Sequence, residues 1–433
     1  MSAIPRLAGP PLLGLNARFL RDPLGLFLRA QREHGDLVEL DLGVAGSVYA
    51  AFHPDGVRQV LMNGRRAHRQ LLRQLLGKGL FTSPTGDDWT RRRRLLTPLF
   101  RAERLAAMTP LLLRPLDAAF DQRWHPGARV DLGAEMKRIT VAMMVDATFG
   151  ARDDVDRPAA RAALSFLLGY VDHQLFAFPT IPRSWPTPAN RRYRADIAAL
   201  RAIIGTALVT LRRKPGTEPT FLDGLLAHQG DFTDHELVDE VLSIFIAGTE
   251  TTGTALVWAL HLLSEHPEHA EALRTEVAGA LGGADPTGER LRGLTRPRAV
   301  VREALRLYPP AWALRRVVDE PLEIAGHEVP AGARLIVSSY ATHRHPGVWE
   351  RPLEFDPRRW LGGEGRHRFA YFPFGAGAHQ CVGNTFAQLE GDLLLTRAAQ
   401  RFRLDRPAAP TTGTKPAIAL TPVPTPHPLL LPA

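Results

Sequence analysis

The chain has 433 residues, of which 45% are hydrophobic and 23% are charged. That balance is typical of a globular protein with a large buried core, and it excludes an intrinsically disordered chain. The net charge of +9 would suit an acidic partner, but aromatic residues make up only 7% and do not interleave with basic stretches, so nucleic acid is not an expected partner. A single cysteine excludes an internal disulfide, and a cytoplasmic location is expected.

The N-terminal segment, residues 1–20, is rich in proline and holds no apolar run near the roughly 20 residues that span a bilayer. We expect neither a signal peptide nor a membrane anchor in it. Residues 36–52 alternate apolar and polar side chains around a pair of glycines, which predicts a short β-hairpin. A second strand-rich stretch is predicted at residues 322–340, because turn signals interrupt it twice.

Trp89 precedes four consecutive arginines at positions 91–94. Successive helical residues are turned by about 100°, so the four arginines cannot share one face, and some of them form an ordinary solvated basic surface. Trp89 and Arg93 are four residues apart and do share a face. Further along, residues 182–194 contain three prolines, and we expect a loop between helices there.

The longest predicted helix covers residues 233–265. Thr233 and Glu236 match a capping box at its start, and Pro267 lies just beyond its end. Its middle is apolar on most faces except at residues 249–252, so we expect a buried helix with a polar interruption. The threonines there could simply bond back to the carbonyl four residues earlier. Glu250 is harder to dismiss, because a buried carboxylate needs a partner, water or a function.

Glu303 and Arg306 are three residues apart on a helical pattern, so they can pair, although most such pairs are solvated surface charges. The cysteine loop, residues 374–383, reads FGAGAHQCVG and precedes a helical pattern at about residues 384–401. A lone cysteine is most often a small buried hydrophobe. A helix N-terminus, however, favours the thiolate that a metal ligand requires, and glycines let the backbone approach a flat ligand.

The cysteine loop has two other interpretations. A nucleotide-binding loop needs the G-x-G-x-x-G spacing between a strand and a helix, which this stretch lacks. A catalytic thiol without a cofactor needs a histidine and an asparagine or aspartate in a triad, and that possibility stays open.

The pattern F-G-x-G-x-H-x-C-x-G resembles the haem-binding signature of the cytochrome P450 family. The resemblance implies a mainly α fold with small β-sheets (α+β), a triangular single domain over residues 1–433 with the long helix above the haem. It further implies that Cys381 is the thiolate ligand of the iron, that Phe374 packs beside it and that His379 contacts a propionate. Gly375 and Gly383 are then haem-binding positions.

Other motifs match the family in the same order. By resemblance, Trp89 and Arg93 bind haem propionates, and Arg316 supplies another such contact, with the adjacent Arg315 as a rival.

The stretch 355–360 resembles the family's meander motif, whose arginine joins the earlier pair in a buried structural triad of Glu303, Arg306 and Arg359. The motif carries Trp360 where phenylalanine is commoner, and no disturbance is expected from that change.

Residues 247–252 resemble the family's oxygen-activating motif, in which the helix widens locally above the iron. Ala247 and Gly248 are then haem contacts, while Glu250 and Thr251 hold water and deliver protons. A relay is required because the departing oxygen atom must receive two protons to leave as water.

The resemblance therefore implies a monooxygenase with haem b, O2 as co-substrate, and electrons from NAD(P)H through ferredoxin and ferredoxin reductase. The expected enzyme is a monomer that inserts one oxygen atom into a lipophilic secondary metabolite such as a terpenoid or polyketide. The other arginines of the run, Arg91, Arg92 and Arg94, are hypothesised to dock an acidic ferredoxin. The substrate-pocket candidates are Leu80, Phe81, Ala247, Ala311, Trp312 and Leu314.

Three alternatives stay open at this point. One is a P450-type enzyme that catalyses oxidative coupling or rearrangement, or that uses peroxide directly. Another is a haem-based gas sensor, which the Glu250 and Thr251 pair disfavours because a carrier gains nothing from a proton relay. The third, a cofactor-free thiol enzyme, predicts a colourless protein.

Overall fold

A computed structural model describes residues 3–10, 14–66, 70–176, 181–228, 230–362, 367–407 and 413–433. The chain divides into two compact units. The sheet unit comprises Met1–His68 and Arg302–Cys381, and the helical unit comprises Arg69–Val301 and Val382–Ala433. The expectation of a single domain stays a prediction.

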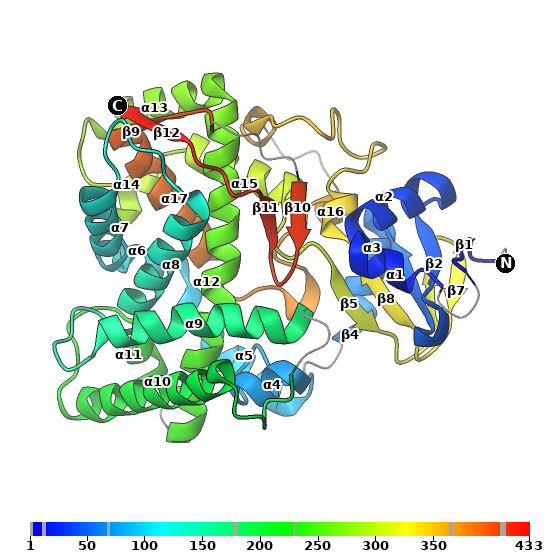
Figure 1. The fold of residues 1–433 in the computed structure, drawn as a ribbon, viewed down its shortest axis with the longest axis horizontal. Helices are drawn as coiled ribbons and strands as arrows, with labels where there is room; N and C mark the ends of the chain where they lie inside the picture. The colour runs from blue at the N-terminus through cyan, green and yellow to red at the C-terminus, as the bar shows by residue number, and fades with distance from the viewer. Residues whose placement is uncertain are drawn as a thin grey trace. The chain divides into compact units, whose positions relative to one another are not determined.

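The sheet unit is built on a six-stranded sheet (Figure 1). Its strands, in spatial order, are β1 (Arg6–Leu7), β2 (Leu37–Asp41), β3 (Ser47–Ala51), β8 (Arg334–Val337), β5 (Leu314–Val317) and β4 (Arg65–Arg66). β2 and β3 are antiparallel, with Leu37 opposite Ala51, which confirms the hairpin predicted at residues 36–52. A separate hairpin joins β6 (Leu322–Ile324) to β7 (His327–Val329). Its two-residue turn is Ala325-Gly326, and both residues have the positive φ that such tight hairpin turns need.

Helices cover this sheet and supply its core. They are α1 (Asn16–Arg21), α2 (Pro23–His34), α3 (Pro54–Asn63) and α16 (Ser339–Thr342). The sequence of a further helix, α15 (Arg296–Leu307), crosses the unit boundary. α2 begins where the Asp22 side chain accepts the Gly25 N–H. Its Phe27 is fully buried against Phe52, with ring centroids 6.2 Å apart. Short 3-10 turns complete the unit: η1 (Gly43–Ala45), η3 (Pro357–Trp360), η4 (Arg368–Ala370) and η5 (Gly377–His379).

The helical unit is built around one long helix, α12 (Asp234–Glu265), which packs most extensively against α8, while α9 crosses it (Figure 1). The other helices are α4 (Gln70–Leu76), α5 (Asp87–Leu96), α6 (Ala102–Ala107), α7 (Thr109–Arg123), α8 (Leu132–Phe149), α9 (Arg157–Phe176), α10 (Pro188–Arg213), α11 (Phe221–Leu226), α13 (Pro267–Leu281), α14 (Gly288–Arg292) and α17 (Asn384–Arg401), with a 3-10 turn η2 (Thr97–Phe100). Two small antiparallel sheets pair β9 (Phe402–Asp405) with β12 (Leu429–Pro432) and β10 (Gly413–Pro416) with β11 (Leu420–Val423).

The start of α12 confirms the predicted capping box. The Thr233 side chain accepts the Glu236 N–H, while the Glu236 carboxylate accepts the Thr233 N–H. Within the described residues, α12 is the one helix long and apolar enough to cross a membrane by length and composition, yet 72% of its apolar window is buried inside the protein. It is therefore a core helix of this unit.

The loop predicted at residues 182–194 is wrong in its second half, because α10 already begins at Pro188. Thr187 caps the helix by accepting the Asn190 N–H, and proline is well tolerated at the first helical position, where its missing N–H has no helical partner. The proline that suggested a loop thus marks a helix start.

The capping box yields a stability prediction. Replacing Thr233 with alanine (Thr233→Ala) removes one acceptor for the first turn of α12, so the free energy of unfolding should fall by about 1 kcal/mol. Chemical denaturation followed by circular dichroism measures this. The control is Thr90→Ala, because the exposed Thr90 hydroxyl donates to the Gly86 carbonyl at the start of α5 and caps no N–H group. Equal losses in the two variants would contradict the capping role.

Candidate functional site

The cysteine loop, in the sheet unit, is folded back on itself. The Cys381 N–H donates to the Phe374 carbonyl over 2.8 Å, and the Gly375 N–H donates to the Phe372 carbonyl over 2.9 Å. The Cys381 side chain is exposed within the structure. The loop therefore presents a sulfur on a backbone whose own hydrogen bonds are made locally.

Glycine is required in this loop for a steric reason. Gly375 and Gly377 both have φ of +69°, a left-handed conformation that other residues adopt only with strain. A Cβ at Gly377 would also lie 2.7 Å from the Leu61 carbonyl oxygen of α3. Phe374 and His379 are half-buried on either side of these glycines, and Gly383 caps α17 two residues after Cys381.

Arg316 on β5 is the better candidate for an anion partner than Arg315. Its side chain is only 4% exposed, whereas Arg315 is exposed. Its Nη1 donates to the Arg315 carbonyl over 3.0 Å, but its buried Nε has no hydrogen-bond partner among the described residues. Burial lowers the pKa of Arg316 to about 10. A buried cation of this kind suits a negatively charged group such as a propionate.

Glu303, Arg306 and Arg359 are in direct contact in the sheet unit. Arg306 binds the fully buried Glu303 carboxylate through two hydrogen bonds of 2.9 and 2.8 Å. The Arg359 Nε donates to the same carboxylate over 2.9 Å. Arg306 also donates to the backbone carbonyls of His343, Pro352 and Glu354. The triad therefore joins α15 to the segment that leads to the cysteine loop.

Sequence reasoning missed the part that Trp360 plays. Its indole Nε1 donates to Glu303 Oε2 over 2.8 Å, and the Asp356 N–H adds another bond to Oε1 over 3.0 Å. The tryptophan thus acts as a further donor to the carboxylate, which phenylalanine could not be. The signal in the sequence was the indole N–H itself, next to an arginine already assigned to Glu303.

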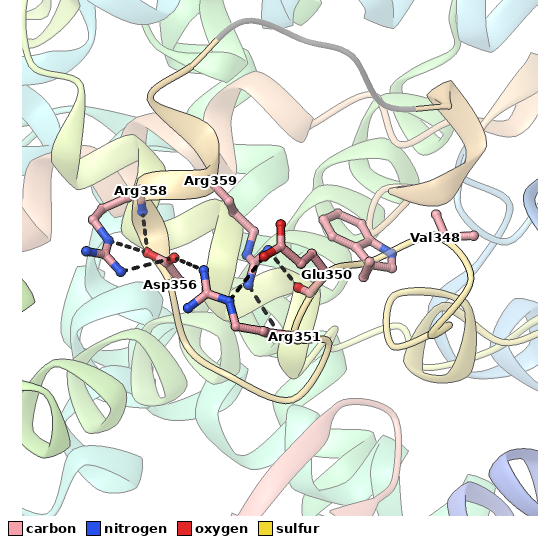
Figure 2. A pocket seen from close by; sticks show the side chains of 7 residues that line it. Val348, Glu350, Arg351, Asp356, Arg358 and Arg359 are labelled. Carbon is pink, nitrogen blue, oxygen red and sulfur yellow. Dashed lines mark hydrogen bonds and ion pairs between the residues drawn. The ribbon is translucent and has the colours of Figure 1, made fainter.

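A cavity of about 420 Å³ opens beside this triad (Figure 2). It is lined by Val348, Trp349, Glu350, Arg351, Asp356, Arg358 and Arg359. Figure 2 shows Arg351 and Arg358 turned toward Asp356, which they contact at 3.3 and 2.7 Å. Its paired charges make it unsuited to a lipophilic ligand.

The arginines after Trp89, in the helical unit, differ sharply in environment. Trp89 is buried, and Arg93, one turn further along α5, is half-buried. Arg92 is 2% exposed, and its guanidinium binds Glu240 and Glu236 over 2.6 Å each and Asp88 over 2.8 Å.

Arg91 is also engaged within the unit, since it contacts Asp88 and Glu236 at 2.8 Å and lies 4.9 Å over the Phe232 ring. Carboxylates distant in sequence bind both side chains, and Arg92 is buried, so it does not form part of a docking surface for a ferredoxin. Docking through Arg91 and the exposed Arg94 stays a prediction.

Gly248, Glu250 and Thr251 lie midway along α12. A Cβ at Gly248 would lie 2.4 Å from the Met144 methyl group, so α8 packs closely on this turn. The Thr251 hydroxyl donates to the Ala247 carbonyl over 2.9 Å. α12 is α-helical at every residue from Asp234 to Glu265, so the local widening implied by the family resemblance is not seen. In this conformation the Thr251 hydroxyl bonds the Ala247 carbonyl within the regular helix.

Glu250 lines a cavity of about 230 Å³ in the helical unit. The lining residues are Gly133, Lys137, Thr249, Glu250, Gly253, Thr254, Val257, Thr421, Pro422 and Thr425. Burial raises the pKa of the Glu250 carboxyl, and the positive charge of Lys137 partly opposes that rise. A carboxyl with a raised pKa beside a polar cavity is suited to taking up and releasing protons.

The substrate-pocket candidates fall in both units. Leu80, Phe81 and Ala247 belong to the helical unit. Ala311, Trp312 and Leu314 belong to the sheet unit, where Trp312 packs against the sheet core, 6.3 Å from the Phe27 ring.

Glu303 and its donors Arg306, Arg359, Trp360 and Asp356 form the Glu303 cluster, which leads to a prediction about Trp360. The variant Trp360→Phe removes one donor from a buried carboxylate, so the free energy of unfolding should fall by about 1–3 kcal/mol. Urea denaturation of the purified protein measures the loss. The control Trp185→Phe changes an indole that is 59% exposed and should leave stability within about 0.5 kcal/mol of the parent. If Trp360→Phe were as stable as the control, the hydrogen bond would have no energetic role.

Comparisons with known proteins agree with this geometry. The family model for Cytochrome P450 matches residues 7–428. Cyclooctat-9-en-7-ol 5-monooxygenase of Streptomyces melanosporofaciens is 36% identical over 93% of this chain and 89% of its own length. Pentalenene oxygenase of Streptomyces avermitilis is 32% identical over 91% and 89% of the two chains.

Among solved structures, the cytochrome P450DA heme domain superposes with a TM-score of 0.87 at 26% identity, covering 100% of this chain and 98% of that one. The family match spans both units and includes the cysteine loop, the Glu303 cluster and the polar turn of α12. The chain therefore belongs to the cytochrome P450 family.

Proposed function

We propose that this monooxygenase inserts one oxygen atom into a cyclic terpenoid, with Cys381 as the iron ligand and Glu250 and Thr251 as the proton-delivering pair. The observation that carries the proposal is the exposed Cys381 side chain on a glycine-rich loop whose backbone hydrogen bonds are satisfied locally. Membership of the family brings haem b as cofactor and O2 as co-substrate, with NAD(P)H as the ultimate electron source.

The residues of the sheet unit fit a haem. Cys381 supplies the sulfur, and the glycines at 375 and 377 keep side chains off the loop surface. Arg316 offers a buried guanidinium with an unused N–H, suited to a propionate, and His379 is a further propionate contact. In the helical unit we assign Trp89 and Arg93 to propionates, and Ala247 and Gly248 to contact with the macrocycle. Thiolate-ligated haem supplies the activation of dioxygen.

The helical unit supplies protons in this proposal. Glu250 faces a polar cavity, and its raised pKa means that it holds a proton more readily than an exposed carboxyl. Thr251 follows it directly, and its hydroxyl oxygen keeps free acceptor capacity while its proton bonds the Ala247 carbonyl. Protons can therefore pass from the cavity to the Glu250 carboxyl and from there to the neighbouring Thr251 hydroxyl.

The substrate class is inferred from two sources. Two relatives are named for cyclooctat-9-en-7-ol and pentalenene, which are cyclic terpenoids. Most of the six pocket candidates are apolar, which suits a molecule of few polar groups. We assign the lining to Leu80, Phe81, Ala247, Ala311, Trp312 and Leu314.

Electrons reach the enzyme one at a time from a separate ferredoxin and its reductase, and the protein acts as a cytoplasmic monomer. The single cysteine supports a reducing compartment, because the chain makes no internal disulfide.

The iron ligand is tested by visible spectroscopy. Dithionite-reduced protein under carbon monoxide should show a strongly red-shifted Soret band, because an anionic sulfur ligand donates electron density to the iron. The variant Cys381→Ser should lose that shift while its circular dichroism spectrum is retained. A shifted band in Cys381→Ser would exclude Cys381 as the ligand.

The proton-delivering pair is tested by product accounting. In Thr251→Ala, haem content should match the parent, while most of the NAD(P)H consumed should appear as hydrogen peroxide instead of oxidised substrate. The control is Thr148→Ala, a buried threonine of α8 whose hydroxyl likewise bonds a carbonyl four residues earlier. Tight coupling in Thr251→Ala, or uncoupling in both variants alike, would contradict the assignment.

A further inference from the structure

The loop between α4 and α5 is bonded to α12 through backbone N–H groups. This segment, residues 77–83 (the 77–83 loop), carries Leu80 and Phe81. Three of its N–H groups donate to side chains of α12: Lys78 to Asp239 Oδ2 over 2.6 Å, Leu80 to Glu240 Oε2 over 2.9 Å, and Phe81 to Ser243 Oγ over 3.3 Å.

The three acceptors share one side of α12. Positions 239, 240 and 243 lie within just over one helical turn, so their side chains project in similar directions. All three are nearly inaccessible to water, with exposed fractions of 1%, 0% and 3%. Polar groups buried this deeply need partners, and the loop backbone provides them.

Two glycines allow the loop to come this close. Gly77 has φ of +90°, and a Cβ there would lie 2.3 Å from Asp239 Oδ1. A Cβ at Gly79 would lie 2.4 Å from Ser243 Oγ and 2.7 Å from the Asp239 carbonyl oxygen. The close approach of loop and helix therefore depends on positions without side chains.

The acceptors are themselves fixed by arginines from other helices. Arg201 of α10 binds Asp239 over 2.6 Å, and Arg92 of α5 binds Glu240 over 2.6 Å. Burial raises the pKa of Glu240 to about 7, although the Leu80 N–H and Arg92 both favour its charged form. The loop is thus bonded directly to α12 and, through Asp239 and Glu240, indirectly to α10 and α5. Within the loop, the Thr82 hydroxyl donates to the Gly77 carbonyl over 2.6 Å.

We propose that Asp239, Glu240 and Ser243 are positioning residues that hold Leu80 and Phe81 at fixed places in the substrate pocket and thereby set which substrate atom is oxidised. The use of Leu80 and Phe81 as pocket residues rests on the proposed function. The side chains of α12 act on the loop backbone, so they govern selectivity without touching the substrate.

The first test is amide hydrogen exchange of the holoenzyme, resolved by mass spectrometry. In Ser243→Ala, peptides covering the 77–83 loop should exchange about 10-fold faster, because the Phe81 N–H loses its partner. Peptides from α8 should be unchanged. The matched control is Ser264→Ala, a buried serine of the same helix that bonds only the His261 carbonyl. Unchanged loop exchange, or acceleration throughout the helical unit, would overturn the proposal.

A second pair of variants tests the close approach. Gly79→Ala should loosen the loop as Ser243→Ala does, whereas Gly279→Ala in α13, where a Cβ meets open space, should not. Glu240→Gln keeps an oxygen for the Leu80 N–H and should stay nearer to the parent than Glu240→Ala. Equal effects of Gly79→Ala and Gly279→Ala would count against the proposal.

The functional readout uses three probes of the same pocket: pentalenene, cyclooctat-9-en-7-ol and 4-phenylimidazole. In Ser243→Ala and Gly79→Ala, with the carbon monoxide spectrum retained, the spectrally measured Kd of the probes that bind should change by roughly fivefold. The ratio of oxidised products should shift as well.

If neither terpenoid binds the parent but the Kd of 4-phenylimidazole changes in the variants, the substrate class fails and the positioning role stands. If no Kd and no product ratio changes while the loop exchanges faster, the positioning role fails.

Discussion

A carboxylate buried away from water needs hydrogen-bond donors around it. Each unit of this enzyme contains one such carboxylate that several donors bind: Glu303 in the sheet unit and Glu240 in the helical unit. In the sheet unit, Glu303 accepts bonds from Arg306, Arg359, Trp360 and the backbone of Asp356. In the helical unit, Glu240 accepts bonds from Arg92 and the backbone of Leu80. The Glu240 network fixes the 77–83 loop, and the Glu303 network fixes the segment that leads to the cysteine loop, because displacing either segment would leave a buried charge unsatisfied.

Features encoded locally were predictable from the sequence. The capping box at Thr233, the hairpin at residues 36–52 and the pairing of Glu303 with Arg306 each depend on residues a few positions apart. In such short patterns, the spacing along the backbone alone determines which side chains meet. The cysteine loop belongs to the same class, since its glycines and its sulfur lie within ten residues.

Features that join distant parts of the chain were not predictable in the same way. Arg92 was expected on an exposed surface that docks a ferredoxin, yet it is buried against Glu236 and Glu240, which lie more than 140 positions away. The sequence around Arg92 does not indicate these partners, because α5 and α12 bring them together only in the folded chain. The proline at 188 misled for the opposite reason, since one residue type serves both loops and helix starts.

The Glu303 cluster also determines which amino-acid substitutions this part of the chain can tolerate during evolution. Five hydrogen bonds reach one carboxylate, more donors than its roughly four lone-pair sites strictly need. A change at Trp360 removes one of these five bonds, whereas a change at Glu303 leaves two buried or nearly buried guanidinium groups without their shared carboxylate. Substitutions at position 303 should therefore be tolerated far less often than substitutions at position 360.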